Sequence, residues 1–138
     1  MQQRPAGTWP SPISARSLVG GAVGVGEVVP DGDDVWWSES RPDERGRTAI
    51  VRWRDGVTTE VTPPDANVRT SVHEYGGGAW WIDRGVVFYV EFDDQRLRKL
   101  RPGGEPELLS PEPPTPRAYR FADGRVTPDG DWFVCVHE

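Results

Sequence analysis

The apolar residues of this chain fall in many short runs, and glycine and proline stand between the runs rather than inside them. Residues 86–90 and 132–136 are unbroken apolar runs, and tryptophan occurs as adjacent pairs at 36–37 and 80–81. Short runs bounded by turn residues are typical of β-strands. Because neighbouring strand residues point to opposite faces, each paired tryptophan predicts a sheet that is covered on both sides. The pattern therefore predicts an all-β chain.

The strand pattern repeats along the sequence. Residues 31–37, 83–89 and 129–135 each combine a polar turn with a strand, at offsets of 52 and 46 residues. The strands that follow also repeat, since 50–56 matches 97–103 and 60–63 matches 108–111. A unit of four strands with this period is typical of a β-propeller blade.

We therefore predict an incomplete β-propeller of about two and a half four-stranded antiparallel blades. Its parts are an N-terminal arm with a short helical turn (1–22), a first blade (23–64), an inter-blade loop with the second blade (65–114) and the start of a truncated third blade (115–138). The helical turn is expected at 15–19, after Ser14 as N-cap. The smallest propellers need about four blades of about 45 residues, so we expect a longer parent protein. A compact sandwich would instead bring Trp36 and Trp80 into one shared centre.

Charge and cysteine content narrow the possible partners. The 138 residues include 22 acidic and 16 basic side chains, for a net charge of −6. This balance predicts no nucleic-acid partner. Cys135 is the single cysteine, which excludes an intrachain disulfide and predicts a cytoplasmic protein. The early apolar run at 18–25 is too short to span a bilayer, so we expect no membrane partner.

Catalytic and metal motifs are missing from the sequence. No serine lies in a Gly-x-Ser-x-Gly context, and His73 and His137 are the only histidines, so no catalytic triad is predicted. The acidic stretch 31–34 lacks the ligand spacing of a calcium-binding loop and is better explained as a hairpin turn. We expect no catalytic residue, no metal and no cofactor in this chain.

The most unusual segment is 67–81, where three glycines follow Arg69, His73 and Glu74. Consecutive glycines permit positive φ and close backbone approach, as a strand near a crowded ring axis requires. The first strand of a blade lines the central channel, so these three side chains are expected near one mouth of it. Two interpretations remain open: His73 and Glu74 anchor the loop by hydrogen bonds, or they contact a substrate at the channel mouth.

Residues 68–70 and 72–79, the latter containing His-Glu-Tyr-Gly-Gly-Gly, resemble the N-terminal propeller of prolyl oligopeptidase-family serine peptidases. The similarity is to the acylaminoacyl-peptidase and dipeptidyl-aminopeptidase-like branch, and 9–14, 39–42 and 94–97 extend it. The resemblance implies a parent with a propeller capping a C-terminal α/β-hydrolase domain, which is absent from this chain and supplies the catalytic residues. It also implies that the propeller admits short peptides and excludes folded proteins, and that inward residues, here Glu74 with Arg69 and His73 beside it, help to hold the substrate's N-terminus.

The leading hypothesis is thus an N-terminal propeller segment of a serine peptidase that acts on short peptides. In this hypothesis the segment contributes gating and interdomain contact. The alternative is a non-enzymatic propeller that binds a protein or carbohydrate partner and closes its ring by oligomerisation. Either way, open sheet edges are expected to favour self-association.

Overall fold

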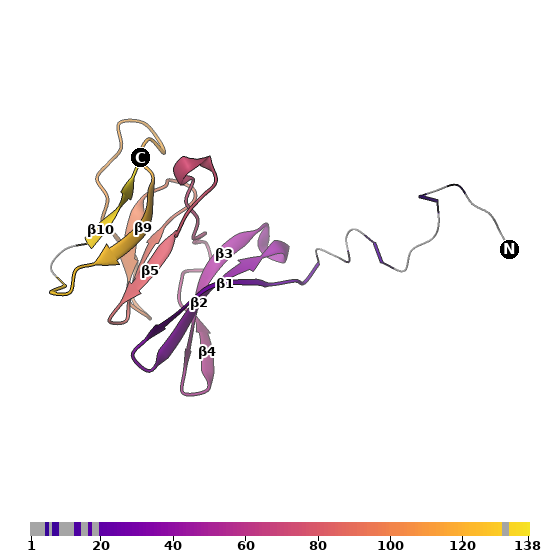
Figure 1. Ribbon diagram of the computed structural model, residues 1–138, viewed down its shortest axis with the longest axis horizontal. Coiled ribbons are helices and arrows are strands. Elements are labelled where there is room, and N and C mark those ends of the chain that lie inside the picture. Colours follow the sequence, from indigo (N-terminus) through magenta and orange to yellow (C-terminus); the bar gives the residue numbers. More distant parts are fainter. Residues whose placement is uncertain (1–4, 6, 9–12, 15–16, 18–19, 131–132) are drawn as a thin grey trace.

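The computed structural model describes residues 5, 7–8, 13–14, 17, 20–130 and 133–138. Within these residues the strands form three antiparallel sheets, each with its strands in sequence order (Figure 1). The prediction of an all-β chain with an incomplete propeller is confirmed, because two four-stranded sheets are followed by a two-stranded one. The first sheet contains β1 (Gly24–Asp31), β2 (Asp34–Arg41), β3 (Arg47–Arg54) and β4 (Val57–Glu60). The second sheet contains β5 (Trp80–Asp83), β6 (Val86–Val90), β7 (Leu97–Leu100) and β8 (Glu107–Leu108), and the third contains β9 (Phe121–Val126) and β10 (Phe133–His137). The described residues also form two short 3-10 turns, η1 (Pro42–Glu44) and η2 (Val72–Glu74).

Polar turns join successive strands and also link one blade to the next. Asp31 ends β1, and its carboxylate accepts hydrogen bonds from the backbone N–H groups of Arg84 (3.2 Å) and Gly85 (2.6 Å) in the β5–β6 turn. These are equivalent turns of adjacent blades. The repeated Asp-Gly chemistry therefore serves both the turn itself and the stacking of the two sheets.

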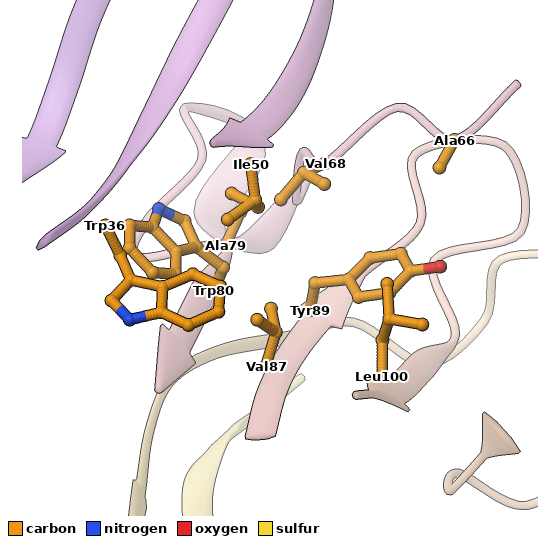
Figure 2. Packing of buried hydrophobic residues seen from close by; sticks show 9 residues of the cluster. All are labelled: Trp36, Ile50, Ala66, Val68, Ala79, Trp80, Val87, Tyr89 and Leu100. Atoms are coloured by element: carbon orange, nitrogen blue, oxygen red, sulfur yellow. The ribbon is translucent and has the colours of Figure 1, made fainter. Parts of the chain in front are cut away.

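A hydrophobic cluster fills the interface between the first two sheets (Figure 2). Trp36 and Ile50 from the first sheet are fully buried, and Val87 and Tyr89 from the second are 0% and 1% exposed. Burying side chains of this size stabilises the interface by about 1.5–3 kcal/mol each. The cluster consists of Trp36, Ile50, Ala66, Val68, Ala79, Trp80, Val87, Tyr89 and Leu100.

Trp36 and Trp80 thus pack in one cluster, an arrangement that the sequence analysis expects only of a compact sandwich. That criterion was wrong, because stacked blades share an interface just as the two sheets of a sandwich do. What separates the two architectures is the far face of the second sheet, which in a sandwich would lie in water.

That far face is covered by the third sheet. Trp81, Val90, Leu97 and Phe121 form a second cluster of buried residues, against which Phe88 packs with its ring 5.7 Å from that of Trp81. The two tryptophans of β5 therefore point to opposite faces, and both are buried (5% and 4% exposed). The expectation of a sheet covered on both sides is confirmed for the second blade.

Two further expectations concern the ends of the chain. The helical turn at 15–19 lies outside the described residues, apart from residue 17. Of the segments that the structure describes, none is a helix long and apolar enough to cross a membrane.

Candidate functional site

The segment between β4 and β5 is held by both blades. The backbone N–H of Val68 donates to the carbonyl of Thr48 in β3 (2.8 Å), and the Asn67 side chain accepts from the Thr48 N–H (2.9 Å). On the other side, the Asn67 N–H donates to the carboxylate of Glu91 after β6 (3.0 Å). This double attachment fixes the residues that follow, including Arg69, relative to both sheets.

The η2 turn places His73 and Glu74 on the surface. Both residues have positive φ (51° and 64°), a conformation that non-glycine residues seldom adopt and that often occurs at functional sites. The His73 N–H donates to the Glu138 carboxylate (3.0 Å), and the His73 Nδ1 lies 3.6 Å from the second Glu138 oxygen. Within the described residues the exposed Glu74 carboxylate forms no ion pair. The following residue, Tyr75, is 95% exposed.

Arg69 lies against an aromatic ring rather than a carboxylate. Its guanidinium carbon is 4.4 Å from the centroid of Phe92, and that of Arg117 is 4.9 Å from the same centroid. Arg117 also donates to the Ser71 hydroxyl (3.2 Å) and to the Asp93 carbonyl (3.5 Å). The electron-rich ring face favours both cations.

The structure brings these predicted residues to one segment but gives them different surroundings. Arg69 and Tyr75 line a cleft of about 330 Å³ between the first blade and the inter-blade segment, which we call the inter-blade cleft. The His73 N–H is hydrogen-bonded to Glu138, whereas the Glu74 carboxylate forms no ion pair with a described residue. A larger groove of about 470 Å³ contains none of the three predicted residues and lies beside the 84–85 and 127–130 turns.

The glycines after Tyr75 fulfil the two roles proposed for them. Gly76 has φ of 93°, which a residue with a side chain would adopt only with strain. Gly78 instead allows close approach, since a Cβ there would lie 2.6 Å from an oxygen of Asp123. The Gly78 N–H donates to that carboxylate (3.0 Å), and the Asp123 N–H donates to the Gly78 carbonyl (2.8 Å). The glycines thus let β5 and β9 meet.

Sequence reasoning missed a second group of polar residues on the first strands of the blades. Glu27 and Asp123 each sit in a β-bulge, where β1 or β9 has two residues opposite one on its partner strand, and both have positive φ. With Trp80 and Arg125 they line a cavity of about 430 Å³. The only available signal was an acidic residue beside glycine in each strand, at 26–27 and 123–124.

The electrostatics of this cavity are set by burial. Partial burial raises the pKa of Glu27 above its usual 4.5, and the nearby Asp123 carboxylate raises it further. The Trp80 indole and Arg125 act in the opposite direction. An acidic group with a raised pKa and a neighbouring cation suits binding and orientation of a polar ligand.

None of the described residues forms a catalytic arrangement. The Ser71 hydroxyl accepts from Arg117 rather than donating to a base, and the His73 ring lies beside Glu138. The part of the chain that the structure describes also contains no group of three or more potential metal ligands.

Comparison with known proteins finds solved peptidase structures that are similar to this chain. A puromycin-hydrolyzing peptidase of Mycobacterium tuberculosis is 39% identical over 99% of this chain, with a TM-score of 0.83. Puromycin hydrolase, solved both as such and as a mutant complexed with PGG, is 34% and 35% identical over 94% and 91% of the chain, with TM-scores of 0.75. No family model and no curated protein matches.

The resemblance to the prolyl oligopeptidase family is confirmed. The chain spans 22% of the M. tuberculosis peptidase and 21% of puromycin hydrolase, a share that is consistent with an N-terminal propeller part of such a peptidase. The three sheets of this propeller segment are therefore successive blades, and β1, β5 and β9 are their first strands.

Proposed function

We propose that this chain is the N-terminal propeller segment of a serine peptidase that acts on short peptides, and that it contributes substrate gating and interdomain contact without catalytic residues. The observation that carries the proposal is the 39% identity to a puromycin-hydrolyzing peptidase across 99% of the chain.

Gating would combine size selection with electrostatic orientation. The first strands of the blades border the channel, whose width excludes folded proteins while short peptides pass. Glu74 offers an exposed carboxylate to a peptide, Arg69 lines the inter-blade cleft, and His73 holds η2 against Glu138. The partner that completes the activity would be a C-terminal α/β-hydrolase domain, and the single cysteine suits a cytoplasmic location.

The test is a chimera in which this chain replaces the matching segment of the M. tuberculosis peptidase. We expect the chimera to hydrolyse short peptides and to leave folded proteins intact. Glu74→Ala should lower peptide kcat/KM several-fold while the unfolding free energy stays unchanged. Glu105→Ala is the matched control, since this glutamate is also exposed and lies in the turn between β7 and β8.

Three outcomes would count against the proposal or part of it. A folded chimera that cleaves no peptide would reject the peptidase role, and equal losses of turnover and stability in Glu74→Ala would assign Glu74 to loop anchoring. Light scattering on the 138-residue chain addresses the alternative of an oligomeric binding module. A stable closed oligomer that binds a protein or carbohydrate partner would favour that module over the peptidase segment.

A further inference from the structure

Most cations in the part of the chain that the structure describes are paired with carboxylates. The arginines at 41, 47, 52, 54, 84, 96, 98 and 120, and Lys99, each lie within 4.0 Å of an acidic oxygen. Five described arginines, at 45, 69, 101, 117 and 125, form no ion pair with a described carboxylate, and of these Arg69 and Arg117 share one aromatic ring.

Placing two like charges beside one ring costs electrostatic free energy unless an anion lies between or near them. Phe92 offsets part of this cost and restricts both guanidinium groups, which lowers the entropy lost on binding. Arg117 uses some donors on Ser71 and Asp93, whereas the side chain of Arg69 makes no hydrogen bond to any described residue. The pair is thus held in place while guanidinium N–H donors remain available to a ligand.

The location of Arg69 also suits a ligand. It lines the inter-blade cleft, whose volume of about 330 Å³ is open to solvent and whose lining includes Gly76 and the exposed Tyr75. An extended peptide end fits such a cleft, because backbone groups and an aromatic surface can contact it without reading its sequence. Planar guanidinium groups match the two oxygens of a carboxylate.

We infer that Arg69 and Arg117 form a carboxylate-binding pair, supported by Phe92, that receives the C-terminal carboxylate of a short peptide at the edge of the inter-blade cleft. This inference rests on the proposed role in peptide gating and adds a preference for free peptide ends.

The experiment uses the 138-residue chain and an N-acetylated alanine tripeptide, either with a free C-terminal carboxylate or as the amide. Binding is followed by NMR of the arginine side-chain Nε–H signals. We expect the free acid to bind at least about tenfold more tightly than the amide, since a charge-assisted bidentate contact is lost in the amide. Added salt should reduce this difference, because the site is exposed.

Variants locate the site. R69Q and R117Q should each weaken binding of the free acid about three- to tenfold, and R69K should retain part of the affinity. R45Q is the matched control, since Arg45 is exposed, has positive φ and forms no ion pair with a described residue. Acetate alone should shift the same Arg69 and Arg117 signals only weakly, which separates a peptide-end site from a general anion site.

The inference would be overturned by equal binding of the acid and the amide, or by no binding of the acid at millimolar concentration. It would also be overturned if the R69Q variant bound the acid as tightly as R45Q. Its failure is separable from failure of the proposed function. A chimera that hydrolyses peptides while the chain ignores the carboxylate would remove this inference alone. An inactive but folded chimera whose arginine pair still binds the acid would remove the peptidase role alone.

Discussion

The contact between Gly124 and Trp81 tests the stacking of the second and third blades. Gly124 is buried in β9, and a Cβ built there would lie 2.1 Å from Cζ2 of Trp81 and 2.2 Å from Cε2 and Cη2. Carbon atoms in contact are normally about 3.5–4.0 Å apart, so Gly124→Ala must displace the ring by more than about 1 Å. The ring is 4% exposed and stacked on Phe88 at an interplanar angle of 6°, which leaves it little room.

Overpacking of this kind costs about 1–3 kcal/mol. Alanine also reduces the conformational entropy of the unfolded chain, which stabilises the folded state by about 0.4–1 kcal/mol. This gain is smaller than the cost of the clash, so the net effect is destabilising. We expect Gly124→Ala to lower the unfolding free energy of the chain by about 1–3 kcal/mol, measured by urea denaturation followed through tryptophan fluorescence. Gly24→Ala is the control, because its Cβ would meet only the Cβ of Ser40, at 3.6 Å.

A second variant distinguishes a steric clash with Trp81 from a general destabilisation by alanine in β9. Trp81→Phe replaces the indole by a smaller ring, so the combination with Gly124→Ala should cost less than the sum of the two single changes. The argument is refuted if Gly124→Ala is as stable as Gly24→Ala, or if the two effects add without coupling. Either result would mean that β9 does not pack on the second blade as described.

Three other changes test separate parts of the fold. Asp34→Asn should cost about 1–3 kcal/mol in denaturant titration, because the buried carboxylate is held by Arg54 at two points, whereas the exposed Asp33→Asn should be neutral. Burial raises the pKa of Glu27, so the folded state keeps this proton to higher pH than the unfolded state does. The unfolding free energy therefore falls as the pH rises from 4.5 through the folded pKa. Glu27→Gln should flatten that fall and stabilise the chain at neutral pH. Trp36→Ala should cost about 3–5 kcal/mol and lower the melting temperature, unless the first two blades are not packed together.

The candidate site was only partly predictable. The segment with Arg69, His73 and Glu74 was identified because three successive glycines are unusual in a strand, and the structure shows why Gly78 is required. Glu27 and Asp123 were missed, because a bulge leaves no clear mark on the alternation of apolar and polar residues. Their proximity depends on how three blades stack, and no pattern within one strand reports it.

The sequence by itself determined the strands, their turns and the four-strand repeat, because side-chain alternation and turn chemistry act between residues close in the chain. It also determined the family resemblance, through a short string of residues at 72–79. Only the tertiary structure decided which polar groups meet. The His73–Glu138 contact joins residues 65 positions apart, and the Gly78–Asp123 contact joins residues 45 apart. Such pairs form when apolar faces of neighbouring blades are buried together, and that burial sets their distances independently of the polar residues themselves.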